Sequence, residues 1–183
     1  MDLSQSKKEQ LQMLQQKCDA ICGQDISISS STEETKVFKK ITQLINIRDR
    51  SSVELFDRLV ADYNELAVSN AIEHAQQCGL LDDMRFAEAL IRTRINANKG
   101  RYGIEAELKT HNIDPYQISG WPHNFFGSDD EELKRALMVL RKKPPTSKNK
   151  VDGAFRRLVQ KGFSVSISSR AAKRWIQEIE NLL

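Results

Sequence analysis

The residues that most often catalyse reactions or bind metals are few in this chain and widely separated. The histidines His74, His111 and His123 have no cysteine, aspartate or glutamate partner at a metal-ligand spacing such as H-x-x-x-H. Cys18 and Cys22 lie on one face of an expected helix, but no second pair occurs elsewhere, which favours small buried side chains over a metal site. The sequence therefore predicts no catalytic centre, no metal site and no cofactor.

Two short motifs resemble chemical sites but have simpler explanations. Asp82 and Asp83 could act as paired carboxylates for a metal, yet they stand at the start of an expected helix. A helix cap and a favourable interaction with the helix dipole explain them better. The loop Gly100-Arg101-Tyr102-Gly103 lacks the Lys-Ser/Thr pair with which a phosphate-binding loop grips a nucleotide. We therefore expect a protein that is not an enzyme.

The basic residues are the remaining candidates for a functional surface. Lys150, Arg157 and Lys161 fall at i, i+7 and i+11 and form a stripe beside the apolar face of an expected helix. The window from Arg92 to Arg101 contains four bases and no acid. The residues that we predict to contact a partner are Arg92, Arg94, Lys99, Arg101, Lys142, Lys143, Lys148, Lys150, Arg156, Arg157, Lys161, Arg170, Lys173 and Arg174.

Two basic groups have structural alternatives that the sequence leaves open. Arg141-Lys142-Lys143 ends an expected helix that begins with the acidic run Asp129–Glu132, and the helix dipole favours this arrangement. Glu88 lies three residues after Arg85 and four before Arg92. An ion-pair ladder within the helix therefore explains Arg85 as well as a ligand site does.

The aromatic residues do not alternate with the basic ones. Phe86, Phe155 and Trp175 lie on apolar helix faces and are expected in the core, whereas Tyr102 and Trp121 are expected to be partly exposed. A platform on which the bases of single-stranded nucleic acid could stack is therefore not predicted.

Composition and charge limit the class of protein. The chain of 183 residues has a formal net charge of +3, but residues 1–34 contain three basic and six acidic residues, and residues 129–183 contain thirteen and seven. A cationic carboxyl-terminal third predicts a nucleic acid or an acidic protein as partner. No apolar run approaches the ~18 residues of a membrane span, no secretory signal is present, and three cysteines fit reduced thiols. We therefore expect a soluble cytoplasmic protein.

Helix signals dominate the chain, and no convincing strand appears. The capping boxes Ser51-x-x-Glu54 and Ser128-x-x-Glu131 each precede apolar residues at helical spacing. Gly79 and Gly162 follow expected helices, and Asp114-Pro115 begins a short one that ends at Gly120-Trp121-Pro122. Helices are also expected over about residues 32–46 and 66–78.

The middle helices repeat at intervals of about fifty residues. Leu59, Leu108 and Leu158 occupy equivalent positions in three successive units. A three-helix unit of this size buries little apolar surface alone, so neighbouring units should stack. We expect an all-α fold of tandem three-helix repeats in an elongated, curved array. Its parts are an N-terminal extension with a helix and a Ser-rich linker (residues 1–34) and three repeats, the last one basic (residues 35–81, 82–128 and 129–183).

Four strings in the sequence resemble a known protein family. The most specific is Gly79-Leu80-Leu81-Asp82-Asp83-Met84-Arg85-Phe86-Ala87, and the others are Arg48–Leu55, Lys99-Gly100 and Lys161-Gly162-Phe163. On these residues, the sequence from about residue 35 to 183 resembles the RecX family of bacterial recombinase regulators. It departs from the family pattern at Arg101-Tyr102-Gly103, which replaces a more usual proline-containing link, and residues 1–34 have no clear counterpart.

The resemblance implies both a fold and a partner. Members of the family are tandem three-helix repeats that bind the RecA recombinase, lie in the groove of its nucleoprotein filament and usually restrain its ATPase and strand-exchange activities; some also touch DNA. The resemblance thus implies a monomeric, non-enzymatic regulator of recombination, DNA repair and the SOS response, with the concave face of the array as contact surface. The alternatives are a helical-repeat protein that competes for DNA, and a purely structural adaptor.

Overall fold

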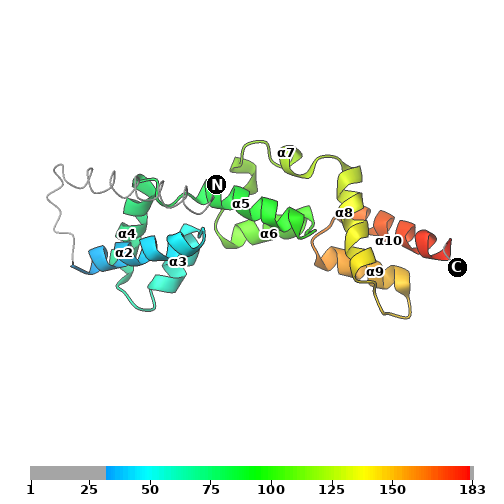
Figure 1. Ribbon diagram of the computed structural model, residues 1–183, viewed down its shortest axis with the longest axis horizontal. Helices are drawn as coiled ribbons and strands as arrows, with labels where there is room; N and C mark the ends of the chain where they lie inside the picture. The colour runs from blue at the N-terminus through cyan, green and yellow to red at the C-terminus, as the bar shows by residue number, and fades with distance from the viewer. Residues whose placement is uncertain (1–31, 182–183) are drawn as a thin grey trace, which may run out of the picture. The chain divides into compact units, whose positions relative to one another are not determined.

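The computed structural model describes residues 32–181, and this part of the chain is entirely helical (Figure 1). The all-α class is therefore confirmed. The helix and linker expected before residue 32 lie outside the described residues, and so do the last two residues, Leu182 and Leu183. The helices are α2 (Thr32–Ile47), α3 (Ser52–Leu59), α4 (Glu65–Gln77), α5 (Asp83–Asn96), α6 (Arg101–Thr110), the 3-10 helix η1 (Pro115–Gln117), α7 (His123–Phe126), α8 (Asp129–Lys142), α9 (Lys150–Gln160) and α10 (Val165–Glu180).

The described residues fall into two compact units, one that ends at Phe86 and one that begins at Ala87, and each has its own hydrophobic core. In the first unit, α2 packs against α4 and α3 closes the group. Ile41, Leu55 and Val68, one from each helix, are completely buried. Ser51 caps α3 as expected, because its hydroxyl accepts a hydrogen bond from Glu54 N at 3.2 Å. Gly79 follows α4 with a positive φ of 68°, as expected of a carboxyl-terminal glycine.

The carboxylates of Asp82 and Asp83 both serve as helix caps. Asp82 Oδ1 accepts hydrogen bonds from Met84 N and Arg85 N at 2.9 and 3.0 Å and so begins α5. Asp83 caps a different helix, since its Oδ1 accepts from Ser52 N at 2.8 Å and its Oδ2 from the Ser52 hydroxyl. The interpretation of this pair as caps is therefore confirmed, with the difference that one of them acts on α3.

In the second unit, α8, α9 and α10 enclose a core to which Leu140, Leu158 and Trp175 belong. Each of these helices has a capping side chain. Asn149, for example, accepts a hydrogen bond from Asp152 N at 3.1 Å and begins α9. The expected repetition is visible in burial, because Leu158 and its counterparts in α3 and α6, Leu59 and Leu108, are all at most 1% exposed.

Helix α6 is preceded by Gly100, which has no side chain with which to cap it. Gly100 N instead donates a hydrogen bond to Lys161 O at 2.9 Å, and Gly103 N donates to Gly162 O at 3.3 Å. A Cβ atom on Gly162, whose φ is +85°, would lie 2.2 Å from Gly103 N. Because only glycines allow this approach, the Lys-Gly strings at 99–100 and 161–162 meet in space.

A carboxylate from α8 completes the start of α6. Arg101 N donates a hydrogen bond to Glu132 Oε1 of α8 at 3.3 Å. This contact matches that of Ser52 N with Asp83 of α5, and both pairs are 31 residues apart in the sequence. The middle helices α3 and α6 therefore each receive an N-terminal cap from a carboxylate in the first turn of a later helix, α5 or α8. This contact satisfies an amide that has no partner within its own helix.

The segment between α6 and α8 folds without a long helix. The short helix expected after Asp114 is the 3-10 helix η1, and the sequence did not predict α7. Trp121 is only 9% exposed and meets the Phe126 ring edge-on, with 5.2 Å between the ring centres, so the expectation of a partly exposed Trp121 is wrong. Short helices offer few aliphatic side chains, and large aromatic rings supply the buried surface here. Tyr102 is 51% exposed, as expected.

Candidate functional site

The basic residues predicted to contact a partner all lie in the second unit, and they divide by side-chain type. Each arginine among them has a carboxylate or carbonyl acceptor in the structure. Among the lysines, Lys99 alone forms an ion pair with another described residue. Apart from Lys99, side-chain type thus separates cations that have an acceptor within the described residues from cations that have none there.

The strongest of the internal ion pairs centres on Glu107 of α6. Arg94 Nε of α5 donates to both of its carboxylate oxygens at 2.9 Å, and Lys99 Nζ donates to Oε2 at 2.7 Å. The hydrogen bond from Arg94, supported by Lys99 and opposed by desolvation, lowers the pKa of Glu107 to about 2. The same hydrogen bond raises the pKa of Arg94. Both cations are therefore engaged within the fold.

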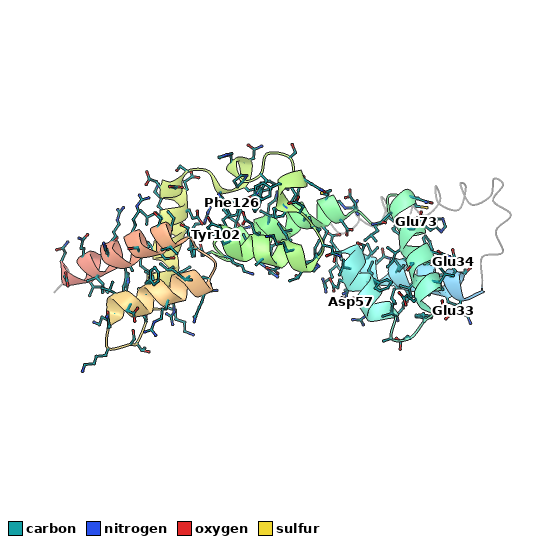
Figure 2. The ribbon with its side chains drawn as sticks, turned by 180° about the vertical axis from the view of Figure 1, so that it is seen from behind. Glu33, Glu34, Asp57, Glu73, Tyr102 and Phe126 are labelled. Carbon is teal, nitrogen blue, oxygen red and sulfur yellow. The ribbon has the colours of Figure 1, made fainter. Side chains whose placement is uncertain are left out.

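Arg92 and Arg101 also have acidic neighbours. Arg92 Nη2 lies 3.1 Å from Glu88 Oε2, in a pair that is exposed to solvent. Arg101 Nε lies 3.2 Å from Glu105 Oε1, without hydrogen-bond geometry, and its guanidinium is 5.2 Å from the ring centre of Tyr102, which projects from the first turn of α6 (Figure 2). The absence of acids between residues 92 and 101 therefore does not leave these bases unpaired, because their glutamates come from outside that window.

A sequence signal for part of this pairing was available. Glu105 follows Arg101 by four residues, which is a helical ion-pair spacing, and Glu88 precedes Arg92 by the same interval. No comparable signal indicated Glu107, because its contact with Arg94 depends on how the turn between α5 and α6 folds.

The predicted contact arginines between residues 129 and 183 are engaged as well. Their carboxylate pairs are Arg156 with Asp152 at 2.7 Å, Arg170 with Asp130 at 3.4 Å, and Arg174 with Glu178 at 3.7 Å. Arg157 differs, because its Nη1 donates to the carbonyl oxygen of Lys143, the residue that ends α8. The predicted stripe of Lys150, Arg157 and Lys161 therefore contains one residue that caps a neighbouring helix.

The remaining lysines are exposed, and none forms an ion pair with any residue that the structure describes. They are Lys142, Lys143, Lys148, Lys150, Lys161 and Lys173. Four of them, Lys142, Lys143, Lys148 and Lys150, lie where α8 ends and α9 begins (Figure 1), and we call these four the lysine segment. An ammonium group without an internal partner can meet an external anion without breaking a contact within the fold.

The described residues provide little for other kinds of site. Across residues 32–181, no group of three histidine, cysteine, aspartate or glutamate side chains could hold a metal ion. None of the helices in that range is long and apolar enough to cross a membrane. Cys18 and Cys22 lie outside the described residues.

Known proteins are similar to this chain over most of its length. The family model described as the second three-helix domain of RecX matches residues 82–119, which include α5, α6 and η1. The regulatory protein RecX of Legionella pneumophila (strain Corby) is 31% identical over 144 residues, which cover 76% of this chain and 94% of that protein. The chain belongs to the RecX family. The resemblance read from the sequence is thereby confirmed.

Other RecX proteins extend this similarity. The regulatory protein RecX of Xanthomonas axonopodis pv. citri (strain 306) is 34% identical over 146 residues, or 78% of this chain and 88% of that protein. The crystal structure of RecX from Lactobacillus salivarius matches with a TM-score of 0.62 at 22% identity and covers 79% of this chain and 97% of that one. A second crystal structure of a regulatory protein RecX also gives a TM-score of 0.62, at 20% identity. The relatives indicate a regulatory role, and the two structures support the helical fold.

Proposed function

We propose that this RecX protein binds the RecA nucleoprotein filament and restrains its ATPase and strand-exchange activities. RecA enters the proposal through the family resemblance of the strings at 48–55 and 79–87. The observation that carries the contact surface is the set of exposed lysines without ion pairs at the end of α8 and the start of α9.

The lysine segment suits a filament of protein and DNA because such a partner presents many negative charges. Flexible ammonium groups make point-charge contacts with phosphates and carboxylates and tolerate small differences in geometry. The alternative cations, Arg94 and Lys99, would have to leave Glu107 to bind, which costs part of the stability of the fold. We therefore place the main contact on the third repeat and keep Arg92, Arg94, Lys99 and Arg101 as secondary predictions.

Inhibition would follow from occupation of the filament surface. A protein bound along the groove covers a surface that must stay open for a second DNA strand or for movement of the recombinase subunits. No catalytic group is required for this effect, because the free energy of binding alone opposes the movement.

A charge-reversal experiment tests the proposal. The triple variant Lys143→Glu, Lys148→Glu, Lys150→Glu should raise the concentration needed to inhibit ATP hydrolysis by RecA on single-stranded DNA at least about tenfold. The matched control reverses Lys36, Lys39 and Lys40, which are exposed on α2 and change the net charge equally. Inhibition by the triple variant at wild-type concentrations would contradict the proposed contact.

A second candidate function is competition for DNA, and the same lysines favour it, since exposed lysines also bind phosphates. The two functions separate when the protein is titrated into bare DNA across a salt series. Tight binding to bare DNA with a steep salt dependence, together with no inhibition when DNA is saturating, would favour competition over filament binding.

A further inference from the structure

A groove lies beside the lysine segment, where the first turn of α9 faces the last turns of α10. It is a shallow hollow, open to solvent, with a volume of about 630 Å³. Among the described residues, the groove is lined by Lys148, Asn149, Lys150, Val151, Ile176 and Glu180. Residues from both helices thus form one continuous surface within the second unit.

The floor of the groove is apolar. Val151 is 40% exposed although it lies on the apolar face of α9, and Ile176 of α10 is only partly buried against the core. An exposed valine beside a half-buried isoleucine provides a surface that a partner's aliphatic or aromatic side chain could cover. Burial of such apolar surface removes it from water and favours binding.

The two sides of the groove carry opposite charges. Lys148 and Lys150 lie on the α9 side, and Glu180 lies on the α10 side. None of the three forms an ion pair with another described residue, so each is available to a ligand. The groove therefore combines two free cations, an apolar floor and a single carboxylate on the opposite side.

We propose that this groove binds an acidic peptide segment of a partner protein, with an apolar side chain on Val151 and Ile176 and a neighbouring carboxylate at Lys148 and Lys150. A phosphate backbone fits less well, because it has no apolar group to cover the floor formed by Val151 and Ile176. The inference deepens the proposed function and rests on it for the identity of the partner, since RecA would supply the segment.

A peptide-binding experiment with the full chain tests this assignment. The probe is a fluorescein-labelled peptide of alternating glutamates and leucines, and its binding is followed by fluorescence anisotropy. Val151→Asp should weaken binding at least about fivefold, and Lys148→Ala with Lys150→Ala about tenfold. Val151 is the second residue of α9, where an aspartate interacts favourably with the helix dipole, so the variant should fold.

Matched variants outside the groove isolate its contribution. Val165→Asp changes an exposed valine at the first turn of α10, and Lys173→Ala removes a free lysine of the same helix; both should leave peptide binding within about twofold. A peptide in which serine replaces leucine should bind at least about fivefold more weakly. Equal affinity for the serine peptide, or wild-type affinity of Val151→Asp, would overturn the proposal.

Two further measurements separate this inference from nucleic-acid binding and from the proposed function. An oligonucleotide that displaces the peptide and shifts the amide resonances of Val151 and Ile176 would assign the groove to nucleic acid and overturn the inference. Full inhibition of RecA by Val151→Asp would show that the groove does not bind RecA. It would overturn this inference and leave the proposed function standing. Peptide binding that follows the expected pattern, without any effect on RecA, would support the groove and remove the proposed function.

Discussion

Two stretches of the second unit look alike in sequence and differ in the structure. Residues 92–101 and residues 141–150 are both rich in bases and free of acids. In the first stretch, Glu88, Glu105 and Glu107 reach in from outside and pair with its cations. In the second stretch, Arg141 likewise pairs with Glu178 at 2.7 Å, but the four lysines of the lysine segment remain without ion pairs to the described residues. A local excess of positive charge therefore does not establish a free cationic surface.

The difference follows from what each stretch is packed against. The first lies at the junction of α5 and α6, where neighbouring helical turns bring glutamates within 3 Å of Arg94 and Lys99. The second contains Pro144 and Pro145, which end α8 and begin a link without acidic residues. Charges fixed at a helix junction stabilise the fold, and charges on such a link are left for a partner.

The largest expected effect concerns the glycine contact that supports the start of α6. Gly162→Ala should destabilise the second unit by about 3 kcal/mol or more, because the new Cβ would clash with Gly103 N and the backbone has positive φ. Gly79→Ala is the control, since its φ is also positive but no atom lies within 4 Å of its Cβ; we expect a loss of about 1 kcal/mol. Urea unfolding measures the free energy of unfolding of both variants. Equal losses of stability would show that the close approach of Gly162 to Gly103 has no energetic importance.

A smaller effect is expected when an internal ion pair of residues 92–101 is removed, so that their cations become free like those of the lysine segment. Glu107→Gln leaves Arg94 and Lys99 without their carboxylate and should cost about 1–2 kcal/mol, reduced by the partial exposure of Arg94. The freed cations should also raise the affinity for bare single-stranded DNA severalfold, measured by anisotropy. Glu88→Gln, which breaks only an exposed pair, should change stability by less than about 0.5 kcal/mol. Unchanged DNA affinity in Glu107→Gln would contradict the role assigned to pairing.

The same ion pairs predict a dependence of stability on pH. Folding lowers the pKa of Glu107 from 4.5 to about 2, so the unfolded chain takes up this proton first as the pH falls. The contribution of the carboxylate is complete above pH 4.5 and is lost as the pH falls towards 2. Thermal unfolding between pH 5 and pH 2.5 should show a shallower decline in Glu107→Gln than in the wild type, by about 1 kcal/mol. Parallel curves for the two proteins would exclude this contribution.

The smallest effect on RecA inhibition is expected from a substitution that preserves the positive charge of the lysine segment. Replacing Lys143, Lys148 and Lys150 with arginine should leave inhibition of RecA within about twofold, because these contacts depend on charge rather than on a fixed geometry. A loss comparable to that of the glutamate variant would instead indicate that the lysines fit shaped sites.

Local signals predicted most of the helices correctly. The helix expected over residues 32–46 is α2, Thr32–Ile47, and the capping boxes at Ser51 and Ser128 do begin α3 and α8. Local signals failed at α7 and Trp121, where burial depends on packing against residues from other turns. The boundaries of the three repeats and the curvature of the array remain predictions.

The amino-acid sequence by itself determined the all-α class, most helix ends and the family, because caps, apolar spacing and short motifs act over a few residues. Tertiary structure decided which cations are free and how α6 begins. Glu107 meets Arg94 across 13 residues, and Glu132 meets Arg101 N across 31. Charge interactions and backbone contacts depend on distance in space, and the chain acquires those distances when it folds.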